Sequence, residues 1–328
     1  MNTNQISNIT KIDSSVLRPL IALLVMALAM TFLSDNFATT DNMFNVFRQV
    51  SVNLCISVGM TMVILTGGID LSVGSILAFS GAIAAGLMKN GISVQWADTY
   101  IGFTFLGCVL AALLIGGALG FFNGLMVSRF KVPPFVATLA MLTIARGATM
   151  LYTNGYPITG IGNEFTYLGT GWFLGIPMPV WVALIIILFF IFFMRKSKAG
   201  RYIYAIGGNE KATRLSGINI NKVKITVYTL TGILCAVAGL LVTARLDSAQ
   251  PNAGGGYELD SIAAVVIGGT SLSGGKGSIL GTVIGALIIG VLNNGLVLLN
   301  VSPFWQQVIK GFVILLAVMI DRIKVNEK

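Results

Sequence analysis

The chain has 328 residues, of which 55% are hydrophobic and only 10% are charged, and its formal net charge is +9. Soluble domains carry about 25% charged residues, so this composition favours a membrane protein over a large soluble helical protein with a rich core. The chain contains no histidine, which excludes histidine metal ligands, a Ser-His catalytic pair and a histidine proton relay.

Ten apolar runs follow one another along the chain, most of them near the roughly 20 residues that a membrane-spanning helix needs. Pro19, Pro134 and Pro179 open three of them, and proline at the first helical position loses no helical hydrogen bond. The eighth run is short and rich in glycine. We therefore expect an all-α polytopic membrane protein, a single domain over residues 1–328 with about ten transmembrane helices, some of them short or broken. The runs cover residues 19–33, 44–66, 73–88, 101–127, 134–152, 179–194, 225–244, 259–270, 278–299 and 304–320.

The positions of the basic residues predict how these runs cross the membrane. Cytoplasmic segments are enriched in lysine and arginine, and most of the 21 basic residues fall in such segments if both chain ends are cytoplasmic. The outside segments then hold mainly acids, including Asp247, Glu258 and Asp260, with Lys89 as the exception. The same clustering argues against a nucleic-acid partner, which the positive net charge alone would suggest. Two connections expected outside, 153–178 and 247–258, either receive a partner or cap helices.

A glycine-rich segment with one carboxylate separates the second and third runs. It reads GGIDLSVGS over residues 67–75 and contains Gly67, Gly68, Asp70 and Ser72. Non-helical backbone at membrane depth is tolerated only inside the protein or beside a cavity. We interpret this segment as a broken-helix element that shapes a pathway.

Part of that segment returns late in the chain, which indicates a weak internal duplication. Residues 268–273 read GGTSLS and begin with Gly268 and Gly269. Asn123-Gly124-Leu125 in the first half likewise corresponds to Asn294-Gly295-Leu296 in the second. The repeats cover about 44–152 and 225–320. The run count makes them parallel, and an error of one run would make them inverted, so both arrangements stay open.

Charged residues inside the runs are candidate functional residues, because a charge at the centre of a membrane helix costs about 2.5–3.5 kcal/mol. With Asp260 assigned to the outside, Asp70 is the only acid placed within the membrane. It either lies on a transport path or accepts the N–H of Ser72 or Val73 as the N-cap of the third helix. Arg146 lies deep in the fifth run, and an Asp70–Arg146 pair is one way to neutralise both.

Further polar side chains occur in the later runs. Lys310 shares one helix face with Gln306 and Gln307, and that face points inward unless Lys310 extends to the membrane surface. Amides within the runs either line a path or hold helices together; they are Asn53, Asn123, Asn293 and Asn294.

The connection 195–224 holds eight basic residues and one acid, Glu210. Its middle predicts a short helix, with Asn209 as the N-cap and Gly217 as the stop. Ala212 and Leu215 are three residues apart and share one face of that helix. Such a helix lies on lipid, docks into another protein, or belongs to a solvated loop.

Nothing in the chain predicts catalysis or metal binding. The segment GGKG at 274–277 has glycine where a phosphate-binding loop needs serine or threonine for magnesium. Cys55, Cys108 and Cys235 stand singly in apolar runs without metal-type spacing, so we expect buried free thiols. The chain is therefore predicted not to be an enzyme and to hold no metal or cofactor.

Several long motifs resemble the sugar permeases of bacterial ATP-binding-cassette (ABC) importers, and the resemblance covers nearly the whole chain. It departs mainly in the N-terminal tail and in the connections 89–100 and 153–175. The motifs are VILTGGIDLSVGS (63–75), GRYIYAIGGNE (200–210), ATRLSGI (212–218), GYELD (256–260) and AAVVIGGTSLSGGKG (263–277).

The resemblance implies an inner-membrane permease subunit surrounded by lipid and paired with a second copy of itself. Cytoplasmic ATPase subunits would bind ATP and magnesium, and an extracytoplasmic sugar-binding protein would deliver the substrate. The motifs are most similar to those of ribose permeases, which implies D-ribose; another pentose, galactose or a furanose-like signal molecule stays open. An ion-coupled secondary transporter using Asp70 or Lys310 is the alternative class.

The resemblance also assigns the connection 195–224 to ATPase coupling, and we call it the coupling connection. The residues that carry this assignment are Gly208, Asn209, Glu210, Ala212, Arg214, Leu215 and Gly217.

Overall fold

The computed structural model describes residues 14–94 and 99–326. The chain ends, 1–13 and 327–328, and residues 95–98 of the connection 89–100 lie outside the described residues, so the predicted location of the termini themselves is not tested. Within the described part the chain forms thirteen helices. They are α1 (Ser14–Leu33), α2 (Thr40–Leu65), α3 (Val73–Asn90), α4 (Phe105–Ser128), α5 (Pro134–Thr153), α6 (Asn163–Thr170), α7 (Met178–Lys196), α8 (Lys198–Gly208), α9 (Glu210–Leu215), α10 (Ile220–Leu246), α11 (Tyr257–Ile267), α12 (Ile279–Leu298) and α13 (Pro303–Asn326).

Six strands of two or three residues add three antiparallel ribbons to this mostly helical chain. The prediction of an all-α protein missed them, because each strand is too short for an alternating pattern to appear in the sequence. The pairs are β1 (Ile92–Val94) with β2 (Thr99–Ile101), β3 (Ile158–Thr159) with β6 (Ser248–Ala249), and β4 (Trp172–Phe173) with β5 (Ile176–Pro177).

Local signals explain several helix starts. Pro134 is the first residue of α5 and Pro179 the second residue of α7, close to the predicted position. Pro19 is different, because α1 begins at Ser14 and contains Pro19 in its second turn. The prediction that Pro19 opens a helix is wrong. An interior proline loses one hydrogen bond and crowds the carbonyl four residues back, here that of Ser15, yet α1 still extends to Ser14.

Among the residues that the structure describes, seven helices are long and apolar enough to cross a membrane: α2, α3, α4, α5, α7, α10 and α12. Leu17–Leu33 of α1 and Pro303–Met319 of α13 are shorter apolar helices, and α11 has 11 residues. The structure thus supports a polytopic membrane protein, while the count of ten spans stays a prediction.

The helices form an inner and an outer set. In α2, 83% of the most apolar window is buried inside the chain, compared with 22% in α7. Leu106, Leu110 and Leu114 are exposed at spacings of four along α4. Soluble proteins rarely expose such continuous apolar stripes, so these faces match a lipid environment.

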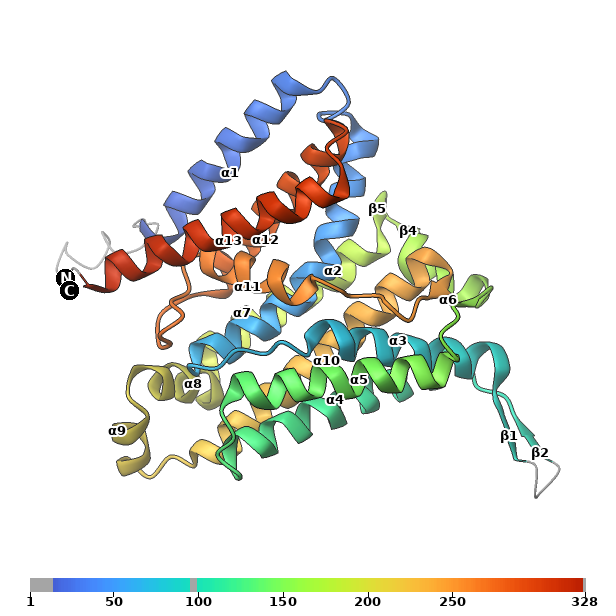
Figure 1. Ribbon diagram of the computed structural model, residues 1–328, viewed down its shortest axis with the longest axis horizontal. Helices are drawn as coiled ribbons and strands as arrows, with labels where there is room; N and C mark the ends of the chain where they lie inside the picture. Colours follow the sequence, from blue (N-terminus) through green and yellow to red (C-terminus); the bar gives the residue numbers. More distant parts are fainter. Residues whose placement is uncertain (1–13, 95–98, 327–328) are drawn as a thin grey trace, which may run out of the picture.

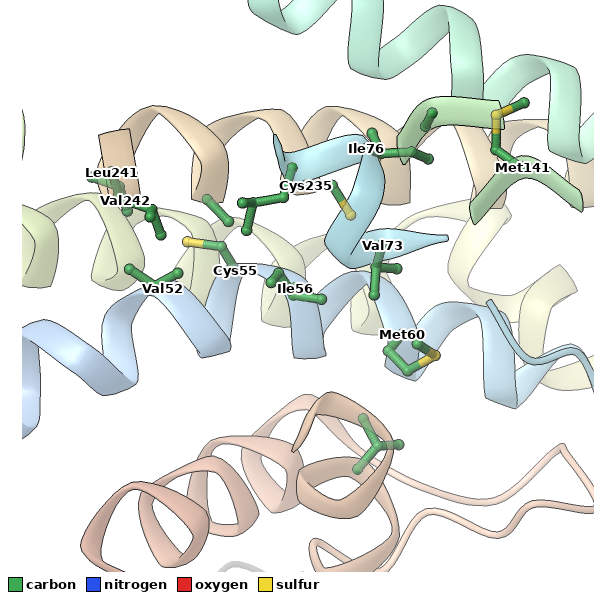
Figure 2. Packing of buried hydrophobic residues seen from close by; sticks show 14 of the residues in the cluster. Val52, Cys55, Ile56, Met60, Val73, Ile76, Met141, Cys235, Leu241 and Val242 are labelled. Atoms are coloured by element: carbon green, nitrogen blue, oxygen red, sulfur yellow. The ribbon is translucent and has the colours of Figure 1, made fainter. Parts of the chain in front are cut away.

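Helices α2, α3, α5 and α10 supply the central core. Val52, Cys55 and Ile56 of α2 share one buried cluster with Cys235 and Val242 of α10 (Figure 2). The three cysteines are free and buried, as predicted. Backbones also approach closely: a Cβ on Gly232 of α10 would overlap the carbonyl oxygen of Gly116 on α4. Small residues are what permit such packing between apolar helices, where the membrane supplies no hydrophobic driving force.

The molecule has two distinct ends (Figure 1). The start of α1, the end of α13 and the helices α8 and α9 gather at the left end of the view, whereas the β1–β2 ribbon and α6 lie at the opposite end. Both described chain ends therefore share one side with the coupling connection.

Candidate functional site

The predicted break between the second and third runs is present. Helix α2 ends at Leu65 and α3 begins at Val73, and we call residues 66–72 the first break. Gly67 has a φ of 78°, a conformation that favours glycine. The N–H of Gly67 donates to the carbonyl of Ile64 at 2.8 Å, and that of Gly68 to Val63 at 3.1 Å, which closes the helix end.

Asp70 holds the first break together. Its Oδ1 accepts the N–H of Ser72 at 2.9 Å and the hydroxyl of Ser72 at 2.6 Å. The amide of Asn123 on α4 donates to the same hydroxyl at 2.9 Å, and all three residues are buried. The predicted bond to Ser72 is confirmed, but Ser72 rather than Asp70 is the N-cap residue of α3.

A second break, residues 268–278, follows α11 and has a closely similar helix end. Gly269 has a φ of 89°. Its N–H donates to Val266 at 2.9 Å, and the N–H of Thr270 donates to Val265 at 3.1 Å. The first break has the same two hydrogen bonds and the same positive φ. There the positive φ occurs at the first glycine of the Gly-Gly pair, Gly67, whereas here it occurs at the second, Gly269. Because such helix ends are common, the internal duplication stays a prediction.

The two breaks meet at the end of α8. The N–H of Gly275 donates to the carbonyl of Leu65 at 3.0 Å. A Cβ on Gly207 would overlap both that carbonyl oxygen and the nitrogen of Gly275. Tyr204, also on α8, donates its hydroxyl to the carbonyl of Gly277 at 3.0 Å. Sequence reasoning did not single out Gly207 within the coupling connection, because its only signal was its place in a Gly-Gly pair before α9.

Helix α9 has the ends that the sequence predicts. The side chain of Asn209 accepts the N–H of Ala212 at 2.9 Å, and Gly217 has a φ of 80°. Ala212 and Leu215 are exposed, Leu215 to 90%. Leu215 thus presents an exposed apolar side chain on a helix with a defined start and end.

Glu210 fixes α9 to the start of α10. Its Oε2 accepts from Lys224 at 2.7 Å, and its Oε1 accepts from Arg214 at 3.0 Å. The hydrogen bond from Lys224, followed by the positive charges of Lys224, Arg214 and Lys131, lowers the pKa of Glu210 in spite of its partial burial. The carboxylate is therefore ionised at neutral pH.

The predicted Asp70–Arg146 pair is wrong. The guanidinium of Arg146 instead donates to the carbonyls of Pro251 and Ala253 at 2.7 and 2.9 Å. The connection after α10 returns alongside the bundle before α11 begins (Figure 1), and Gly254 packs against the backbone of Gly74 at the start of α3. Backbone carbonyls thus accept hydrogen bonds from the guanidinium of Arg146, and composition does not reveal such partners.

Lys310 points inward and donates to Asp260 on α11 at 3.0 Å. The side chain of Asp260 is only 11% exposed, so the pair lies largely inside the chain, and the assignment of Asp260 to an outside segment stays a prediction. Gln306 bonds the carbonyl of Val301 at 2.8 Å.

The two adjacent asparagines of α12 behave differently. Asn294 exchanges two amide hydrogen bonds with Asn42 on α2, at 2.9 and 2.8 Å. Asn293 lines a polar cavity. Asn53 accepts a long bond of 3.4 Å from Ser57 and lines the same cavity. Asn294 therefore joins helices, whereas Asn53 and Asn293 both line the polar cavity.

Apolar outer helices around two partly buried helix breaks, with an exposed capped helix at one end, are typical of a polytopic membrane protein. The chain matches the family of branched-chain amino acid transport system permease components over residues 42–318, and it belongs to this family.

The chain is 53% identical over 311 residues to the ribose import permease protein RbsC of Escherichia coli (strain K12), covering 94% of each chain. It is 50% identical over 310 residues to RbsC of Bacillus subtilis (strain 168), covering 94% of this chain and 93% of that one. To the D-allose transport system permease protein AlsC of Escherichia coli (strain K12) it is 40% identical over 289 residues, 88% of this chain and 86% of that one. No solved structure was found to match. The resemblance to sugar permeases is thereby confirmed.

Proposed function

We propose that the chain is the permease subunit of an ABC importer that carries D-ribose across the inner membrane. The assignment of D-ribose as the substrate rests on sequence identity. The chain shares 53% identity over 94% of both chains with a ribose import permease, compared with 40% for a D-allose permease. The chain does no chemistry itself; ATP and magnesium bind to the partner ATPase.

The contact of α8 with both breaks supports a route for coupling. The ATPase holds α9 through the exposed Leu215. Movement of α9 is transmitted to α8, because a single residue, Asn209, separates the end of α8 at Gly208 from the start of α9. Gly207 lies against Leu65 of α2 and Gly275 of the second break. A shift of α8 therefore acts on both breaks at once and opens or closes the pathway.

The remaining partners follow from this arrangement. The coupling connection faces the cytoplasm, so the described ends of α1 and α13, which lie on the same side (Figure 1), are cytoplasmic too. The opposite end receives the extracytoplasmic sugar-binding protein. A second copy of the chain completes the pathway, and lipid covers the apolar stripes of the outer helices.

ATP-dependent uptake in reconstituted vesicles tests the proposal. Vesicles contain the permease with its ATPase subunits, and the binding protein outside carries labelled D-ribose, D-allose or D-galactose in parallel samples. We expect ribose uptake that requires ATP and the ATPase. Uptake that persists without the ATPase would indicate the ion-coupled alternative, and transport of another sugar in place of ribose would change the substrate.

A further inference from the structure

A polar cavity of about 110 Å³ lies where α2, α10, α11 and α12 converge. It is much larger than the ~10–15 Å³ that one water molecule requires. Gln49 at its edge is exposed, so the cavity opens to the surface of the chain. Its polar lining consists of Gln49, Asn53, Arg245, Tyr257, Asp260 and Asn293.

Helical spacing explains why these side chains meet. Gln49 and Asn53 are four residues apart on α2, and Tyr257 and Asp260 are three apart on α11, so each pair shares one helix face. On α12, Gly290 and Asn293 are also three apart, and the small Gly290 leaves room beside the amide. Three separate helices thus turn a polar face toward one point.

The cavity lies beside the start of the short helix α11. The connection that Arg146 holds through Pro251 and Ala253 ends at Gly256, whose φ of 86° turns the chain into α11. Tyr257 and Asp260 belong to the first turn of α11. Transporters place substrate-contacting groups at such interruptions, because non-helical backbone needs a polar cavity beside it.

Polar groups in the cavity are available for a ligand. Among the described residues, no hydrogen-bond partner reaches the buried Oδ1 of Asn293. Leaving a buried acceptor without a donor is unfavourable, so a ligand hydroxyl that reaches this enclosed oxygen when neighbouring side chains move gains binding energy. The negative charge of Asp260 is balanced by Lys310 at 3.0 Å, and the carboxylate can still accept a hydrogen bond from a ligand.

We propose that this cavity bonds the hydroxyl groups of the monosaccharide as it passes through the chain. This inference rests on the proposed function. Amides and tyrosine both donate and accept hydrogen bonds, arginine donates and a carboxylate accepts, which matches hydroxyl groups that do both. The branched apolar side chain of an amino acid would leave these groups unpaired, at a cost in affinity.

Two adjacent asparagines provide a matched test in the reconstituted complex with ATP, ATPase and ribose-loaded binding protein. For Asn293→Ala we expect ribose uptake to fall about threefold to tenfold, the effect of one hydrogen bond, with unchanged thermal stability and sustained ATP hydrolysis. Asn294→Ala removes the bonds to Asn42 instead. We expect it to lower the thermal stability without lowering the ribose transported per ATP hydrolysed by the folded fraction.

Thiol labelling adds a readout that does not depend on turnover. The native cysteines are all buried, so a hydrophilic thiol reagent should give little background. We expect Asn293→Cys to be labelled and millimolar D-ribose to slow that labelling, whereas Asn294→Cys should resist the reagent.

The two sets of results separate the inference from the function on which it rests. If the unmodified complex imports ribose, and Asn293→Ala and Asn53→Ala both import it equally well, the cavity is not a sugar contact. Labelling at position 293 that ribose does not slow overturns the inference as well. An unmodified complex that imports no ribose contradicts the proposed substrate itself.

Discussion

Lys310 on α13 donates a hydrogen bond to Asp260 on α11 across 3.0 Å, which joins the last long helix to the short helix that follows the returning connection. The two side chains are 27% and 11% exposed. Removing one partner of a fully buried pair costs about 3–5 kcal/mol, because it leaves an uncompensated charge. The remaining exposure of Lys310 reduces that cost here.

We expect Lys310→Met to destabilise the protein by about 1–3 kcal/mol, seen as a lower midpoint of thermal unfolding in detergent. Adding Asp260→Asn removes the isolated charge and should restore part of the loss. An unchanged midpoint in the single variant would show that the pair contributes nothing to stability.

The link from Glu210 to Lys224 predicts a dependence of the α9 position on pH. The pKa of Glu210 is lower in the folded protein than its ordinary value of 4.5. Its stabilising contribution is therefore complete above pH 4.5 and is lost as the pH falls through the lowered pKa. A spin label on Ala212→Cys should report a constant α9 mobility from pH 8 to 5 and a rise below pH 4.5. With Glu210→Gln as the control, mobility should be higher and independent of pH; the same acid response in that variant would assign the effect to another group.

Asp70 offers a test of a structural against a transport role. Asparagine keeps an oxygen that accepts from the N–H and hydroxyl of Ser72, so Asp70→Asn should retain ribose uptake within about twofold. Asp70→Ala leaves these buried donors without that acceptor and should cost about 1–3 kcal/mol of stability. Complete loss of uptake in a stable Asp70→Asn protein would instead place the carboxylate on the path.

The features that the sequence predicted correctly are local. Asp70 and Ser72 are two residues apart, and Asn209 bonds the N–H three residues on, so spacing alone identifies each bond. The sequence failed where the partner is distant. Arg146 bonds carbonyls more than 100 residues away, and backbone carbonyls are the same for every residue type. The partner of Lys310 is Asp260, and the position of Asp260 depends on how the connection after α10 folds back. That connection leaves no periodic pattern in the sequence from which its path could be predicted.

The exposed Leu215 predicts the contact that couples the permease to its ATPase. Because this side chain is 90% exposed, Leu215→Ala should leave thermal stability unchanged. We expect weaker ATPase binding and lower uptake, measured by co-purification and by vesicle transport. Leu174→Ala changes another exposed leucine, 77% exposed in the β4–β5 turn, and serves as the control. Equal effects of the two variants would contradict docking at α9.

Gly207 and Gly208 are adjacent at the end of α8, yet only Gly207 is enclosed. A Cβ on Gly207 would overlap the backbone of Leu65 and Gly275, whereas a Cβ on Gly208 meets nothing within 4 Å. Backbone atoms cannot rotate away as a side chain can. Gly207→Ala should therefore separate α8 from the two breaks.

We expect Gly207→Ala to lower ribose uptake at least tenfold while ATP hydrolysis continues, because α9 still docks but its movement no longer reaches the pathway. Gly208→Ala should change uptake by less than about twofold, since alanine also suits a helix better than glycine. Vesicle uptake and ATP hydrolysis measured on the same preparations give the ratio of ribose to ATP. If that ratio is the same for both variants and the unmodified protein, the contact between α8 and the breaks is packing alone and does not transmit movement.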